Sequence, residues 1–255
     1  MAIQRVRSKW SKTKTLMRAH DLRAFIPLTK RYNRESLRSM MEQFDMVYIK
    51  PDSGTFGKGV IRLEKVAEPE SGYRYQIKKE THHVASLDEV YRALQSYTSA
   101  KCYLIQRGVY LLKHNGRRFD IRVMVQRNLK NQWETTGIIG RLAHPERIVT
   151  NYHSGGTIKP FEKLMAKHCN SSEIAAYKRR LEILGVSIGK QLATDYPGLK
   201  ELGVDVAIDT KLHPWVLEVN TKPHPYVFSW MSDKRVYDRV RRYSLAYGGM
   251  KKKRS

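Results

Sequence analysis

The stretch GVDVAIDTKLHPWVLEVN, residues 203–220, carries two runs of alternating apolar and polar residues around a short turn. This pattern predicts a β-hairpin. If the turn is symmetric and centred between positions 211 and 212, the numbers of paired residues sum to 423, which places Asp205 opposite Glu218. Trp215 and Val219 then lie on the reverse side of the hairpin. In the first strand, the face that carries the acids is predicted to contain Asp205, Ala207 and Asp209. In the second strand it is predicted to contain Val216, Glu218 and Asn220.

Two opposed carboxylates destabilise a hairpin unless a cation lies between them. Asn220 adds a neutral oxygen two residues beyond Glu218, whereas Asp209 is expected to act as a turn residue. Such a set of hard oxygen ligands suits Mg²⁺, which takes its remaining ligands from water and substrate phosphates. The alternative is a solvent-facing polar strand whose acids are neutralised by Lys and Arg, and the hairpin by itself leaves both open.

A second feature is the glycine-rich loop KPDSGTFGKG, residues 50–59, between predicted strands 46–50 and 60–66. Its three glycines allow the backbone to approach a ligand closely. Their spacing matches neither a Walker A loop nor a dinucleotide fingerprint. Taken alone, the loop is compatible with a phosphate cradle or with an ordinary hairpin turn.

Charge is the main global feature, because 48 Lys and Arg residues outnumber 24 acids and give a net charge of +24. A surface of this kind attracts polyanions. No recognition motif for a specific nucleic-acid site is present. No apolar run approaches the roughly 20 residues of a transmembrane helix, and the basic start has no secretory signal. The two isolated cysteines favour a reducing, cytoplasmic location.

The remaining periodicity predicts an α+β fold with mostly antiparallel strands. The 41% of hydrophobic residues are sufficient for a core. Residues 151–160 read as irregular. The predicted helices are 12–20, 34–44, 86–98, 172–195 and 233–247. The predicted strands are 46–50, 60–66, 73–79, 102–112, 119–127, 133–143, 202–209 and 214–220.

Several motifs together resemble a known family. The hairpin is similar to the metal-binding hairpin of ATP-grasp ligases, in which an Asp and a Glu-x-Asn hold Mg²⁺ on ATP. SKWSKTKTL, IKPDSGTFGKG, YLIQRGV, FDIRVMVQ and VTNYHSGG, in this order, resemble the endospore-coat-associated YheC/YheD family of spore-forming bacteria. The likeness extends over about residues 8–245. No counterpart of the extra domain that commonly precedes an ATP-grasp core is expected within these residues.

The resemblance implies an ATP-grasp fold, with two α+β subdomains of mostly antiparallel sheets that clasp ATP. It divides the chain into an N-terminal helical segment (1–45), a lid subdomain (46–108), a C-terminal subdomain with the metal hairpin (109–247) and a basic tail (248–255).

The resemblance also assigns roles to residues. Asp205, Glu218 and Asn220 would hold Mg²⁺. Arg122, oriented by Asp120, would stabilise the transferred phosphate. Arg141 would bind the acyl phosphate or an acceptor carboxylate, and Asn151 would lie in a loop over the reacting phosphate. One of Lys9, Lys12 and Lys14 would contact phosphate. The ATP-binding residues would be Lys50, Ser53, Gly54, Thr55, Gly57, Lys58, Gly59, Gln106, Arg107 and Val109.

The activity that follows is an ATP- and Mg²⁺-dependent carboxylate–amine ligase acting through an acyl phosphate and linked to the endospore coat. The basic charge favours an acidic peptide or anionic polymer as the acceptor. Two alternatives stay open: a non-catalytic spore-coat structural protein that keeps the fold, and a basic polyanion-binding protein.

Overall fold

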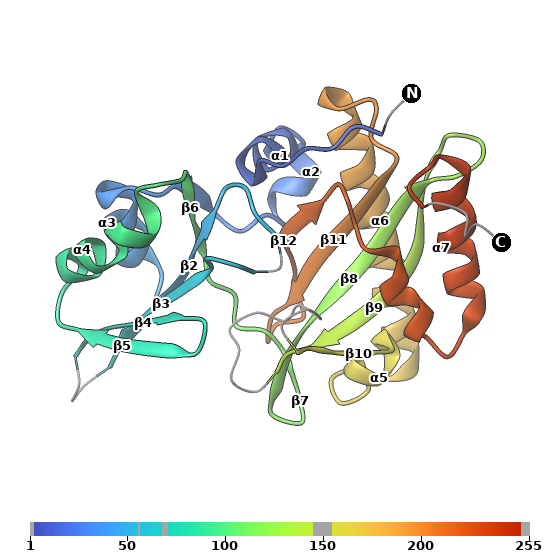
Figure 1. Ribbon diagram of the computed structural model, residues 1–255. Coiled ribbons are helices and arrows are strands. Elements are labelled where there is room, and N and C mark those ends of the chain that lie inside the picture. The colour runs from blue at the N-terminus through green and yellow to red at the C-terminus, as the bar shows by residue number, and fades with distance from the viewer. Residues whose placement is uncertain (1–2, 56, 68–70, 145–154, 251–255) are drawn as a thin grey trace.

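Two antiparallel sheets with helices packed on them form the protein, as a computed structural model describes it for residues 3–55, 57–67, 71–144 and 155–250 (Figure 1). The α+β class is therefore confirmed. None of the helices in these ranges is long and apolar enough to cross a membrane.

The first sheet has the strand order β1-β6-β2-β3-β4-β5, and α3 and α4 pack together against it (Figure 1). Its core joins apolar residues of both helices, such as Met40 and Leu94, to strand residues such as Val47 and Ile105. The strands are β1 (Thr29–Arg31), β2 (Met46–Pro51), β3 (Ile61–Val66), β4 (Gly72–Ile77), β5 (Glu80–Val84) and β6 (Tyr103–Arg107). The helices are α3 (Arg34–Gln43) and α4 (Leu87–Thr98).

The second sheet has the order β10-β9-β8-β11-β12, with β7 paired to β8. Its strands are β7 (Lys113–His114), β8 (Arg117–Arg127), β9 (Trp133–Leu142), β10 (Thr157–Lys159), β11 (Glu201–Ile208) and β12 (Pro214–Asn220). The middle strands are buried on both faces, so that in β8 every residue from Phe119 to Gln126 is buried, including the charged Asp120 and Arg122. Covering this sheet are α1 (Lys9–Met17), α2 (His20–Arg23), α5 (Phe161–Met165), α6 (Ser171–Asp195), η2 (Pro225–Trp230) and α7 (Lys234–Ala246).

The helices on the second sheet form two layers. Leu181 and Ile188 of α6 pack with Leu16 of α1 in one core, while Phe228 of η2 and Val240 of α7 pack in another. Helices α6 and α7 therefore lie on opposite faces of the sheet (Figure 1). The long helix α6 begins where the sequence provides a capping box between Asn170 and Glu173.

The central hairpin confirms the predicted pairing of Asp205 with Glu218, but a β-bulge produces it. Between the bulge and the turn, Ile208 pairs with Pro214, so the numbers of paired residues sum to 422 and not to the predicted 423. A register shift between Asp205 and Val206 leaves Leu217 as the extra residue and restores the expected pairing at the acids.

Because of the bulge, two residues of β12 point to the face opposite to the predicted one. Val216 lies opposite Val206 and is buried in the core, whereas Trp215 lies opposite Ala207, on the face of the acids. Asp209 is a turn residue as expected, because its Oδ1 accepts from the backbone N–H groups of Lys211 and His213, both at 2.9 Å.

Other differences concern short or edge strands. β1 lies within the segment expected to be helical, β5 covers a stretch with no predicted strand, and β10 lies within the segment read as irregular. The strand predicted over 102–112 ends at Arg107.

Candidate functional site

A cleft of about 660 Å³ lies between the loop that follows β2 in the first sheet and side chains of β8, β9, β11 and β12 in the second. It brings together segments that are far apart in the sequence. Eleven residues singled out from the sequence line it: Lys9, Lys50, Gly54, Thr55, Gly57, Lys58, Arg122, Arg141, Asp205, Glu218 and Asn220.

At the base of the cleft is a buried network of ion pairs. Arg122 Nε donates to Asp205 Oδ1 at 2.6 Å, and Arg141 Nη2 lies 3.0 Å from Asp205 Oδ2. Arg141 Nε also donates to Asp120 Oδ1 at 2.8 Å. Burial would raise the pKa of Asp205, but the two guanidinium groups outweigh it and hold that pKa below its ordinary value.

This network corrects the expected partner of Arg122. Asp120 was expected to orient it from the same strand, yet Asp120 pairs with Arg141. The reason is the register, because Asp120 lies opposite Arg141 across β8 and β9, and Arg122 lies opposite Asp205 across β8 and β11. Direct cross-strand neighbours are closer than alternate residues of one strand.

The acidic side chains at the cleft supply oxygen atoms of the kind that binds Mg²⁺. Asp205 uses one acceptor position on each oxygen for arginine, and a carboxylate offers about four. Glu218 opens onto the cleft with 27% of its side chain exposed, and Asn220 Nδ2 lies 3.5 Å from Asp205 Oδ2. The described residues contain no cluster of three His, Cys, Asp or Glu. Such an ion would therefore depend on two carboxylates, the Asn220 amide oxygen, and oxygens from water and phosphate.

A small cavity beside the cleft is lined by three buried lysines, and two of them, Lys9 and Lys50, also line the cleft itself. Lys50 Nζ donates to Gln106 Oε1 at 2.7 Å and to the carbonyl of the bulged Leu217 at 2.9 Å. Lys9 Nζ donates to Gly54 O at 3.2 Å and lies 3.5 Å from Glu218 Oε1. Burial, only partly offset by Glu218, lowers the pKa of Lys50 to about 8.

Lys12 is the third buried lysine. Burial lowers its pKa to about 8, and the carboxylate of Glu218 is the largest of the nearby charges that act in the opposite direction. Its Nζ donates to Val6 O at 2.9 Å. Of the lysines near the start of the chain that the sequence left undecided, Lys9 is the one that lines the large cleft.

Three of the predicted ATP-binding residues line a second cavity, of about 100 Å³, at which Lys50 is shared with the cleft. Gln106, Arg107 and Val109 all contribute to it. The Gln106 side chain is fixed at both ends, because its Nε2 donates to Thr29 Oγ1 at 2.9 Å. The Arg107 guanidinium stacks 4.8 Å from the centre of the Trp215 ring.

Two further predicted residues, both in the glycine loop, are not part of the cleft lining. These are Ser53, which is exposed, and Gly59. Gly59 has a φ of +76°, and a Cβ there would meet the Tyr103 hydroxyl at 2.9 Å, so this glycine is needed for the shape of the loop. Asn151 lies outside the described residues.

Sequence reasoning missed one wall of the cleft, formed by Glu201 and the segment from Lys222 to Val227. The signal available was the run KPHP, which follows the hairpin directly and combines a cation with two prolines.

Comparison with known proteins places these features in a family. A family model described as YheC/D like ATP-grasp matches residues 2–250. The endospore coat-associated proteins YheD and YheC of Bacillus subtilis (strain 168) are each 24% identical to this chain, over 247 and 225 residues that cover 94% and 84% of it. These matches span only 53% and 59% of the two relatives.

Solved structures share the fold at low sequence identity. D-cycloserine synthetase DcsG is 11% identical with a TM-score of 0.55, over 92% of this chain and 70% of that one. N5-carboxyaminoimidazole synthetase from Staphylococcus aureus, solved with ADP, is 11% identical with a TM-score of 0.51, over 96% of this chain and 52% of that one. The fold is therefore the ATP-grasp fold, and the chain belongs to the YheC/D-like ATP-grasp family.

Proposed function

We propose that this chain is an ATP-dependent ligase that joins a carboxylate to an amine. The observation that carries the proposal is that one cleft brings together the glycine loop, two buried lysines, two arginines and the Asp205–Glu218–Asn220 set. The family membership and the ATP-grasp fold support it.

In this proposal the protein binds and orients the nucleotide. The adenine ring enters the small cavity at Gln106–Val109 and Lys50 reaches the α-phosphate. Backbone N–H groups of the glycine loop and the Lys9 ammonium hold the outer phosphates. Mg²⁺, held by Asp205, Glu218 and Asn220, supplies neutralisation of the phosphate charge. The division of the chain into a lid over residues 46–108 and a body over 109–247 belongs to the same proposal.

The chemistry needs no nucleophile from the protein. A carboxylate oxygen of the first substrate attacks the γ-phosphorus, and ADP leaves. The amine then attacks the carbonyl carbon of the acyl phosphate, and inorganic phosphate leaves as the amide forms. Arg122 and Arg141 stabilise the charge that develops on the transferred group, because they are already held in place by carboxylates at the base of the cleft.

The names of the two Bacillus relatives support a further part of the proposal, an association with the endospore coat. The high positive charge is consistent with an acidic partner there.

The test is a screen for ADP release with Mg²⁺-ATP across amino acids, short acidic peptides and anionic spore polymers, followed by the mass of the product. We expect at least one pair of substrates to give ADP and an amide, and Glu218→Ala to abolish both. Equal ADP release by the wild type and Glu218→Ala contradicts the assigned site. Nucleotide binding without product in any combination favours a non-catalytic coat protein.

A further inference from the structure

Immediately after the Asn220 position, the chain forms a row of side chains along one wall of the cleft. Burial alternates over this segment, because Thr221, Pro223 and Pro225 are buried while Lys222, His224 and Tyr226 are exposed. The three exposed side chains all line the cleft. The row therefore begins where the proposed metal ligands end.

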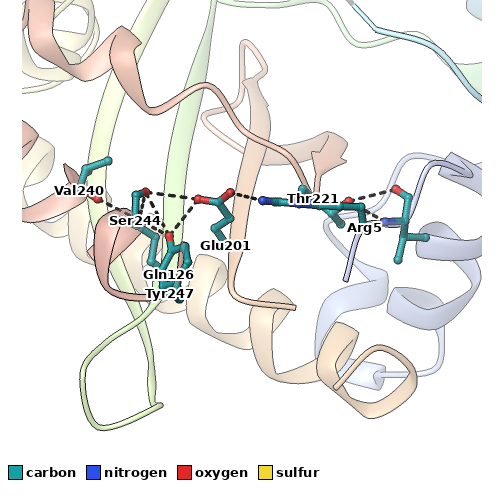
Figure 2. Close-up of polar contacts among 8 residues, drawn as sticks. Arg5, Gln126, Glu201, Thr221, Val240, Ser244 and Tyr247 are labelled. Atoms are coloured by element: carbon teal, nitrogen blue, oxygen red, sulfur yellow. Dashed lines mark hydrogen bonds and ion pairs between the residues drawn. The ribbon is translucent and has the colours of Figure 1, made fainter. Parts of the chain in front are cut away.

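The start of the row is anchored by a buried polar network (Figure 2). Val6 N–H donates to Thr221 Oγ1 at 2.8 Å, and the Arg5 guanidinium donates to the Thr221 carbonyl. Arg5 Nη2 also donates to Glu201 Oε1 at 2.7 Å, and the hydroxyl of Tyr247 donates to Glu201 Oε2 at 2.9 Å. This network links the N-terminal segment, β11 and α7 behind Thr221.

The far end of the row is anchored by packing. Phe228 is fully buried with Met124 and Ile139 of the second sheet. Pro223 and Pro225 restrict the backbone between the two anchors. The His224 and Tyr226 rings lie 5.9 Å apart. The row is therefore held in shape before a ligand arrives, which reduces the entropy lost on binding.

The charge at this wall is positive. Within the described residues, no ion pair joins Lys222 to a carboxylate, whereas Asp205 and Glu201 are both paired with arginine. Among the residues that the structure describes, six cations and three acids line the cleft: Lys9, Lys50, Lys58, Arg122, Arg141 and Lys222 against Glu201, Asp205 and Glu218.

We propose that Lys222, His224 and Tyr226 form the subsite for an acidic peptide segment, which presents its carboxylates to the reacting phosphate. The inference rests on the proposed ligase function. Two residues of chain span at most about 7 Å, so Lys222 and His224 can meet carboxylates on alternate residues of one extended peptide. The exposed ring of Tyr226 offers an apolar surface on which the peptide can pack. A peptide also supplies the carboxylate that the reaction consumes, which a phosphate polymer does not.

The experiment measures the binding of fluorescein-labelled hexaglutamate by fluorescence anisotropy at fixed salt, with a fluorescent ATP analogue titrated separately. The matched control for Lys222→Glu is Lys190→Glu, which makes the same charge change at an exposed position of α6, on the face of the second sheet opposite η2. We expect Lys222→Glu to raise the Kd for the peptide roughly tenfold, because a favourable pairing becomes a repulsion. Lys190→Glu should change it less than twofold.

Three results would overturn the subsite. The first is the absence of saturable peptide binding by the wild type, and the second is an equal loss of peptide affinity in Lys222→Glu and Lys190→Glu. The third is an oligothymidylate of equal charge that binds as tightly as the peptide and loses the same affinity in Lys222→Glu. A loss of peptide affinity at least fivefold larger than any loss of nucleotide affinity supports it. Failure here is distinguishable from failure of the ligase proposal, because ADP release and its dependence on Glu218 are measured without the labelled peptide.

Discussion

The substitution Asp205→Asn tests the buried ion-pair network directly, whatever the substrate. The side chains of Arg122, Arg141 and Asp205 are only 10%, 6% and 8% exposed. Arg141 keeps Asp120 in the variant, but Arg122 becomes a buried cation without its carboxylate. Removing one partner of such a buried pair costs about 3–5 kcal/mol. At about 2–4 °C per kcal/mol for a chain of this size, the melting temperature should fall by roughly 6–20 °C.

A matched control exists on the surface. Asp88 also faces two arginines, Arg34 and Arg38, at 2.9 and 3.0 Å, but these three side chains are 42–58% exposed. Water replaces the lost contacts there, so Asp88→Asn should leave the free energy of unfolding unchanged within the precision of a denaturant titration. The difference between the two variants then reports burial and not the number of arginines.

Two further readouts sharpen this test. Adding Arg122→Met to Asp205→Asn removes the buried cation that has lost its carboxylate, so the double variant should be more stable than Asp205→Asn by at least about 1 kcal/mol. The second readout is pH. Because the folded pKa of Asp205 lies below its unfolded value of about 3.9, its stabilisation is present above that pH and is lost on acidification. The wild type should lose stability below pH 4 more steeply than Asp205→Asn. Equal costs for Asp205→Asn and Asp88→Asn refute the reasoning.

Three other predictions follow from the site. Glu218→Gln should reduce Mg²⁺-dependent ADP release by about 10²–10³-fold and leave the melting temperature nearly unchanged, since the contact with Lys9 is 3.5 Å and partly exposed; release within threefold of the wild type contradicts this. Between pH 8 and 10.5 the unfolded chain binds more protons than the folded one at Lys50, so wild-type stability should rise with pH. In denaturant titrations, Lys50→Met should remove on the order of 2 kcal/mol of that rise in the free energy of unfolding. If the variant shows the same rise as the wild type, the lowered pKa of Lys50 is contradicted. Thr221→Val should cost about 0.5–1.5 kcal/mol, because it leaves the half-buried Val6 N–H without its acceptor at 2.8 Å, and it should weaken hexaglutamate binding; a variant as stable as the wild type contradicts the anchoring role.

The parts of the fold that could be predicted from the sequence are those with a buried face and sufficient length. Strands β8 and β11 and helix α6 bury long apolar patterns, so periodicity identifies them. β5 is exposed along almost its whole length and has no such pattern, and β1 has only three residues, whose strand conformation comes from pairing with β6. These short elements depend on tertiary contacts that a local pattern does not encode.

The site shows the same limit at the level of single residues. Two-residue alternation assumes an unbroken strand, and the bulge at Leu217 breaks that assumption between Val216 and Glu218. The pairing of Asp205 with Glu218 was nevertheless right, because the unsymmetric turn and the bulge shift the register by one residue in opposite senses. The bulge has a structural partner that the sequence does not reveal: the Leu217 carbonyl accepts from Lys50, which lies in the other sheet.

The distribution of the positive charge bears on the choice between a nucleotide cleft and a general polyanion surface. A net charge of +24 suggests only an outer surface that attracts anions. Yet four of the cations that line the cleft, Lys9, Lys50, Arg122 and Arg141, are at most 9% exposed. Burying a cation costs free energy that binding to a polymer at the surface does not require. Such a cost is retained where a small, highly charged anion must be held away from water, and a nucleotide triphosphate is an anion of that kind. The buried cations therefore favour the nucleotide cleft, whereas the exposed basic residues remain available for an acidic partner.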